Sequence, residues 1–286
     1  MKKLLAIAGL LVLTHISSTS FADHKDPKES EIRPHGNLNH TNLSGAKLDF
    51  IDLTGTNMSD AVLRSTEMRG ARLIRANLSN VDLTGTNLSG AILYFADLTF
   101  SNLSSTDLTG TNLSDAKLHA ALLDSADLRG SRLKNANLSN AVLTDANLTS
   151  ARLIRANLSN AVLTGTNLTS ANLTGANLNR ANLNGANLTR AKLTDANLSN
   201  ANLIGAKLSG ASLKGIKLNK ASLTGNNLKN VNLKNANLSG ANLSKANLNE
   251  VVLFDSNLTG ANLSKANLQD AVLSRANLNG ANLKGA

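Results

Sequence analysis

Leucine recurs at every fifth residue from Leu38 to Leu283, with methionine in its place only at Met58 and Met68. The series of fifty units contains no insertion or deletion. An α-helix repeats every 3.6 residues and a strand every two, so a strict period of five would spread the leucines around either element. The period therefore argues against an ordinary helical bundle or sheet and indicates a solenoid of short repeats.

Each five-residue unit has the same internal order. Two residues before the leucine stands a compact side chain, mostly Ala, with Thr, Ser or Val as substitutes. Asn or Asp usually lies between them, Ser or Thr follows the leucine, and the last place holds Gly, Asn, Asp or a charge. If the chain turns a corner once per unit, the compact residue and the leucine point inward and the other positions outward. Four such sides close a square coil of about twenty residues.

Units such as ANLSG, ADLTF and AVLTD resemble the pentapeptide repeat family, whose consensus is A-(N/D)-L-x-x. The resemblance covers residues 36–286. It implies an all-β fold, a right-handed quadrilateral β-helix of about 12 coils with leucine stacked on leucine along each inner column. Each buried leucine then stabilises the fold by about 1.5–3 kcal/mol, and ladders between coils satisfy the backbone.

Residues 1–22 have the pattern of a secretory signal peptide. Lys2 and Lys3 precede an apolar run from Leu4 to Leu13, and small residues flank Phe21 before a cleavage point ahead of Asp23. The run is too short to cross a hydrocarbon core of about 30 Å, and no later segment is apolar enough to span a membrane. We therefore expect an exported protein, periplasmic or extracellular, with no transmembrane span in the mature chain.

Residues 23–35 are expected to form an N-terminal cap before the solenoid of residues 36–286. The segment Asp26-Pro27-Lys28-Glu29 resembles a helix start, with an acid at the N-cap and proline at the first helical position. No cap is visible at the other end, where the pattern runs to Ala286. An open β edge can pair with another chain, so an end-to-end homodimer is one expected assembly.

The charges, with a formal net of +10, are uneven around a twenty-residue coil. The side that contains Leu53, Leu73, Leu93 and the leucines at every twentieth residue after them, called the basic face below, has ten cations and four acids. It also carries most of the outward bulky apolar residues. The residues expected to form an interaction surface on it are Arg72, Arg75, Tyr94, Phe95, Arg132, Lys134, Arg152, Arg155, Lys192, Lys214, Lys234, Phe254 and Arg275.

Two interpretations of this face stay open. A soluble repeat needs scattered charge, and the enrichment of cations on one side is modest. Alternatively, exposed aromatic side chains beside arginine suit a protein, glycan or anionic-surface partner. The partner is thus an unidentified protein or an anionic envelope surface, bound through this face or through an open solenoid end.

Catalysis has little support in the sequence. Only His119 lies well inside the repeats, and the spacing of His24, His35 and His40 matches no standard metal site. No Ser or Thr stands in a distinctive arrangement with His and an acid, no glycine-rich phosphate loop is present, and there is no cysteine. We expect no enzyme activity, no cofactor, no metal and no small-molecule substrate.

The resemblance also raises the class of pentapeptide repeat proteins that look like DNA and protect topoisomerases. Those rods are strongly acidic, whereas this chain has a pI near 10.0 and would be repelled by a basic DNA-binding surface. Ice binding would require an unbroken ladder of threonines on one side of the coil, but other residues interrupt the threonines on every side. The sequence therefore favours an exported, non-catalytic scaffold, with electrostatic association to envelope surfaces as the alternative and a topoisomerase-interacting mimic less favoured.

Overall fold

A computed structural model describes residues 25–286. The predicted signal peptide, residues 1–22, and the first two residues of the predicted cap lie outside the described residues. The chain divides into two compact units, Met1–Asn137 and Leu138–Ala286.

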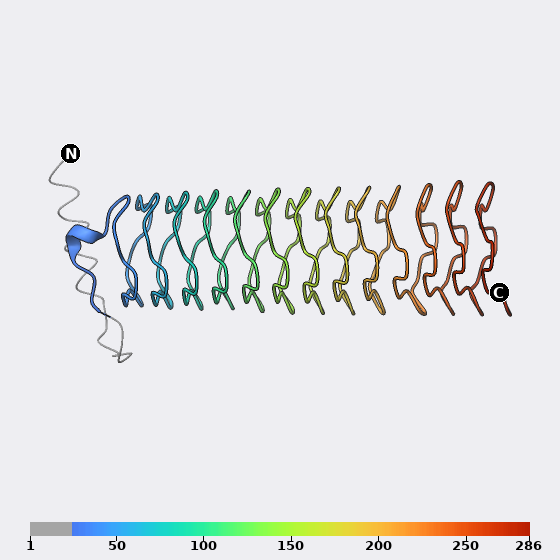
Figure 1. Ribbon diagram of the computed structural model, residues 1–286, viewed down its shortest axis with the longest axis horizontal. Coiled ribbons are helices and arrows are strands. Elements are labelled where there is room, and N and C mark those ends of the chain that lie inside the picture. Colours follow the sequence, from blue (N-terminus) through green and yellow to red (C-terminus); the bar gives the residue numbers. More distant parts are fainter. Residues whose placement is uncertain (1–24) are drawn as a thin grey trace. The chain divides into compact units, whose positions relative to one another are not determined.

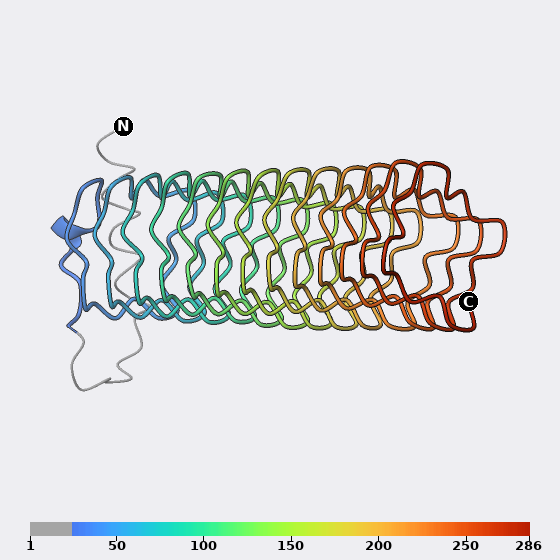
Figure 2. The ribbon, with the colours of Figure 1, turned by 45° about the vertical axis from the view of Figure 1, so that its right-hand side comes forward.

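Both units are built from coils of twenty residues. Parallel β-bridges link residues twenty apart, from Asn37↔Asn57 to Lys117↔Asn137 in the first unit and from Val142↔Val162 to Asn262↔Asn282 in the second. Each of these twenty-residue bridges involves the single residue before a leucine, so the strands are one residue long. Figure 1 shows the successive coils stacked in each unit, and Figure 2 shows equivalent sides lying over one another. The predicted four-sided β-helix with a twenty-residue coil is confirmed.

The core of each unit consists of the leucine columns and the compact residues that precede them. From Leu38 to Leu263 the leucines and both methionines of the series are at most 2% exposed. Backbone ladders run alongside: Leu78 N donates to Asp97 O at 2.6 Å, and Asn77 N donates to Thr56 O at 3.0 Å. The apolar column and the ladder therefore hold each coil to the next, as nearest-neighbour interactions in a solenoid.

The Asn or Asp before each leucine shapes the corner that follows. At Asn77, for example, Oδ1 accepts hydrogen bonds from the backbone N of Ser79 at 3.1 Å and from its Oγ at 2.8 Å. This is an Asx turn, and it explains why Asn or Asp is followed two places later by Ser or Thr. The last residue of most units is left-handed, with φ between 52° and 72°. At Gly70 a side chain is also excluded by contact, because a Cβ there would lie 2.6 Å from the ring of Phe50.

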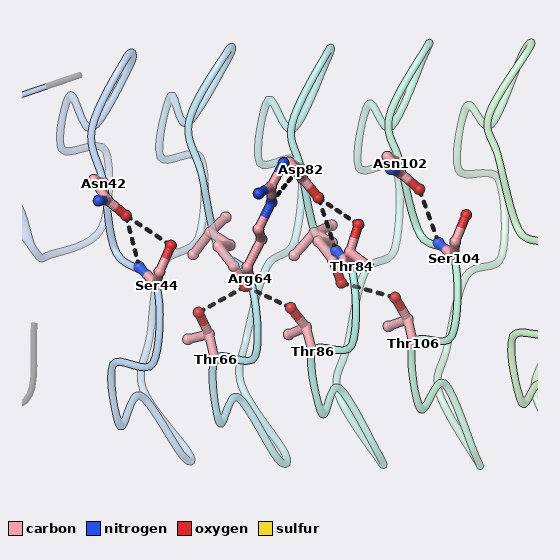
Figure 3. Close-up of polar contacts among 12 residues, drawn as sticks. Asn42, Ser44, Arg64, Thr66, Asp82, Thr84, Thr86, Asn102, Ser104 and Thr106 are labelled. Carbon is pink, nitrogen blue, oxygen red and sulfur yellow. Dashed lines mark hydrogen bonds and ion pairs between the residues drawn. The ribbon is translucent and has the colours of Figure 1, made fainter. Parts of the chain in front are cut away.

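Threonines at the compact position add a second polar stack inside one side of the first unit. Thr66 Oγ1 donates to Leu63 O at 2.7 Å and lies 3.1 Å from Leu43 O, and Thr106 Oγ1 donates to Leu83 O at 2.8 Å (Figure 3). Thr86, on the coil between them, makes the equivalent bond to Leu63 O. A buried hydroxyl is tolerated here because a backbone carbonyl of its own coil or of the preceding coil accepts its hydrogen bond.

The start of the described chain differs from the predicted helix start at Asp26. The one helical element of residues 25–286 is η1, a 3₁₀ turn at Glu29–Glu31 that begins three residues later. Lys25 instead pairs with Thr41, over sixteen residues rather than twenty. Pro34 disfavours helical backbone at the preceding residue, so the turn cannot lengthen before the chain enters the first coil. Within residues 25–286, no helix is both long and apolar enough to cross a membrane.

Candidate interaction face

The twenty-residue register aligns the predicted basic-face residues of the first unit in one column. Bridges run Arg72↔Ile92, Ile92↔Asn112 and Asn112↔Arg132, so these residues lie on one side of successive coils. The side chains of Arg72, Arg75, Arg132 and Lys134 are exposed. The phase count therefore placed these residues correctly in one column of the first unit.

An aromatic pair lies within this column of cations. Tyr94 and Phe95 are 37% and 43% exposed, with ring centroids 4.3 Å apart. The guanidinium carbon of Arg75, one coil earlier, lies 5.7 Å from the centroid of Phe95. A cation within about 6 Å of a ring face is attracted to it. The column thus presents apolar surface next to positive charge.

The second unit repeats the arrangement with other residues. Bridges connect Arg152↔Asn172, Asn172↔Lys192 and Lys192↔Ser212, and the column continues through Asn232↔Val252. Arg152, Arg155, Lys192 and Lys214 are exposed. None of these four forms an ion pair within residues 138–286. Their charge is therefore available to a partner.

Phe254 is the aromatic centre of the second unit's column. Lys234 Nζ lies 4.9 Å from its ring centroid, and the Arg275 guanidinium carbon lies 5.4 Å from it. Arg275 Nε also pairs with Asp255 Oδ1 at 2.8 Å. Phe254 is partly buried between the two cations, so it is a smaller apolar contact than Tyr94 or Phe95. Part of the positive charge is neutralised here, as it is at Arg72, whose Nε lies 3.5 Å from Asp52 Oδ2.

Other exposed aromatic residues lie away from this face. Phe50 is 77% exposed and covers Gly70, while Phe100 is 59% exposed and meets His119 edge-on at 5.7 Å between ring centroids. His35 packs over Gly55. Residues 25–286 contain no group of three His, Cys, Asp or Glu side chains that could hold a metal ion. His24 lies outside the described residues.

Five aspartates of the first unit have pKa values below the ordinary range. The Asp49 carboxylate accepts a side-chain hydrogen bond from Arg69, which lowers its pKa, and that of Asp52 is lowered mainly by a hydrogen bond from Thr54. Burial by itself raises the pKa of Asp82, but hydrogen bonds from Thr84 and Arg64 outweigh it (Figure 3). The same balance lowers the pKa of the other two, Asp97 and Asp127.

Acid is therefore expected to loosen the first unit. A carboxylate whose pKa is lower in the folded state stabilises the fold fully above its unfolded pKa of about 4, and this contribution is lost as the pH falls through the folded pKa. We expect faster amide exchange around residues 82–84 at pH 3 than at pH 7, after correction for intrinsic exchange. Asp82→Asn keeps an Asx acceptor but cannot titrate, so it should reduce the difference; an unchanged difference would contradict this account.

The burial of one asparagine side chain among the compact inward positions was not predicted. Asn226 occupies the compact position two residues before Leu228, and its side chain is 2% exposed. Its signal was present in the sequence, because it is the one asparagine at that position in the fifty units. The leucine period alone does not reveal it.

Comparison with known families matches nearly all of the repeats. The family described as "Pentapeptide repeats" matches residues 36–73, 76–115, 111–149, 121–160, 141–180 and 181–219. A second description, "Pentapeptide repeat region", matches residues 226–286. The chain belongs to the pentapeptide repeat family. The right-handed quadrilateral β-helix implied by the sequence is the fold of this family.

Solved structures of pentapeptide repeat proteins are similar to the chain. HetL, involved in heterocyst differentiation regulation in the cyanobacterium Nostoc, is 38% identical over 72% of this chain and 89% of its own, with a TM-score of 0.46. QnrB1, a plasmid-mediated fluoroquinolone resistance protein, is 17% identical over 78% of this chain and 91% of its own, with a TM-score of 0.30. A protein of the Arabidopsis thaliana thylakoid lumen is 24% identical over 56% and 79% of the two chains, with a TM-score of 0.15. Comparison with curated proteins gives no match.

Proposed function

We propose that this pentapeptide repeat protein is an exported, non-catalytic scaffold that binds a partner protein through its basic face. The observation that carries the proposal is the column of exposed cations in the second unit, Arg152, Arg155, Lys192 and Lys214, none of them in an ion pair within residues 138–286. A rigid backbone ladder positions them, so a partner would meet charges already fixed in register.

Aromatic residues favour a protein partner over a purely ionic surface. Tyr94 and Phe95 in the first unit offer exposed apolar area beside Arg75. Aromatic and arginine side chains are enriched where protein interfaces bury their core. An acidic protein surface with an apolar centre would complement this combination.

Export is supported by the pattern of residues 1–22, with Lys2 and Lys3 before an apolar run and a small-residue cleavage motif. We propose the periplasm or the medium as the site of action. The net charge of +10 is opposite in sign to that of a DNA mimic, so interaction with a topoisomerase by charge mimicry is not favoured.

A charge-reversal experiment tests the proposed function. The triple variant Arg152→Glu, Arg155→Glu and Lys192→Glu should fail to retain, from periplasm and culture medium, a protein that the unmodified chain retains. The matched variant Arg180→Glu, Lys217→Glu and Lys220→Glu makes the same charge change on the side that contains Leu178 and Leu218, and it should bind normally.

The dependence of binding on salt concentration distinguishes a protein partner from an anionic envelope surface. A packed protein interface should largely persist at about 0.5 M salt, where the screening length is only a few ångströms. Equal loss of binding by both triple variants, or complete release by salt, would overturn the protein-partner proposal and favour electrostatic association with an anionic envelope surface.

A further inference from the structure

The backbone ladder of the second unit is interrupted at one side of two neighbouring coils. Beside the interruption, Leu203 N donates to Ser222 O at 2.9 Å and Gly215 N donates to Lys234 O at 3.0 Å. Between these points, within residues 138–286, Lys207 and Asn227 form no bridge, and Figure 1 shows two neighbouring orange ribbons drawing apart at the lower edge. The groups that lack their coil-to-coil partners are the N–H of Gly205, Leu208, Gly210 and Asn227, whereas Ser212 and Asn232 on the next side still form a bridge.

Asn226 accounts for the interruption. The equivalent position of the preceding coil holds Ala206, and the register would pair Ala206 O with the backbone N of Asn227. Instead, Asn226 Nδ2 donates to Ala206 O at 3.1 Å and to Leu203 O at 2.9 Å. Threonine fits at this position without such an effect: beside Thr66, Glu67 N still donates to Ala46 O at 2.9 Å. The longer carboxamide takes the acceptor that the ladder needs and holds the coils apart.

The separation leaves a cleft of about 340 Å³, at the small end of the range for ligand sites. Asn226 lines it, and the buried Oδ1 of this residue has no hydrogen-bond partner among residues 25–286. A buried acceptor without a donor is costly, so the site favours a ligand that brings one. Lys207 and Leu208 line it beside Asn226.

The charge around the cleft is positive. No acidic residue occurs from Ala196 to Asn249, a segment with seven lysines. Lys207 itself lines the cleft, while Lys229, on the next coil of the same side, is paired with Glu250 at 3.5 Å. The free N–H of Leu208 adds a backbone donor at the same place. Hydrogen-bond donors and positive charge together favour an anionic ligand. Asn226 Oδ1 is an acceptor, so it favours a ligand that also has a hydroxyl group to donate a hydrogen bond.

We propose that this cleft binds a small hydroxylated anion, either a hydroxy acid or a sugar phosphate. Its hydroxyl donates to Asn226 Oδ1, and its oxyanion accepts from Lys207 and from the N–H of Leu208. The site lies on the side that contains Leu188, Leu208 and Leu228, not on the basic face, so it is independent of the proposed partner binding.

Titration of the full mature chain with D-gluconate and with D-glucose 6-phosphate tests the proposal. We expect at least one to bind with a Kd of roughly 1 mM or lower, and D-glucose and inorganic phosphate to bind at least about tenfold more weakly. Binding of only one of the two anions identifies carboxylate or phosphate as the preferred group. If neither organic anion binds, or if inorganic phosphate binds as tightly as both of them do, the proposal is wrong.

Two variants connect binding to the structure. Asn226→Ala restores the common residue of this position, so it should close the ladder, protect the Leu208 and Gly210 amides from exchange and abolish binding. Lys207→Ala should weaken binding about tenfold without that protection, whereas Lys217→Ala, an exposed lysine on another side, should have no effect. Anion binding that survives in a protected Asn226→Ala variant would overturn the proposal.

Discussion

Leu123→Ala is expected to lower the free energy of unfolding by about 3–5 kcal/mol, whereas Leu122→Ala should change it by less than about 0.5 kcal/mol. The two residues are adjacent and chemically identical. Leu123 belongs to the five-residue series and is 0% exposed, while Leu122 stands at the Asn/Asp position and is 41% exposed. Truncating Leu123 leaves a cavity in a leucine column, and truncating Leu122 leaves none.

Denaturant unfolding followed by circular dichroism measures both variants. Because a solenoid can lose its coils in stages, amide exchange should accompany the measurement and locate the loss at the coil that contains Leu123. Leu103 N donates to Leu122 O at 2.7 Å, so the amide of Leu103 is a suitable local probe. A comparable loss in both variants would mean that the five-residue phase does not decide which leucine is buried.

The period allowed the coil to be predicted because each unit repeats the same physical choice. A leucine and a compact residue must face inward every five residues, and four corners close the coil, so the register of twenty follows from Leu38 onward. Family membership and the alignment of Arg72 with Arg132, or of Arg152 with Lys192, follow from that register. These features depend on spacing alone.

Features that depend on individual side chains could not be predicted in this way. The spacing of the leucines does not predict that Arg275 forms an ion pair with Asp255 and also lies over the ring of Phe254. Nor does it predict that Phe50 covers Gly70. It also favoured a helix start at Asp26 where the structure has a 3₁₀ turn at Glu29–Glu31. In each case a local contact or a nearby proline decides the outcome.

Asn226 is the clearest example of a feature that the leucine period does not predict. The leucine phase passes through Leu228 without interruption, yet the ladder beside it is broken. Periodicity records which positions face inward, but not whether an inward carboxamide finds enough donors and acceptors. That question requires the hydrogen bonds of the neighbouring coil.

The central claim, that one side of the coil forms the binding surface, makes the second large prediction, which concerns two deletions. Removing residues 156–175 deletes one whole coil, and removing residues 166–175 deletes half of one; neither segment contains a charged residue. Both variants should fold, because every side carries the same inward pattern. The first deletion keeps Lys192 and Lys214 on the side of Arg152 and Arg155, whereas the second moves them to the opposite side.

The most direct measurement is the affinity of both deletion variants for the captured partner at one salt concentration. We expect the whole-coil deletion to bind within about threefold of the unmodified chain and the half-coil deletion to bind at least about tenfold more weakly, a difference of about 1.4 kcal/mol or more. Amide exchange of the leucine columns should first show that both variants are folded. Equal affinities in two folded variants would contradict a binding surface defined by the basic face.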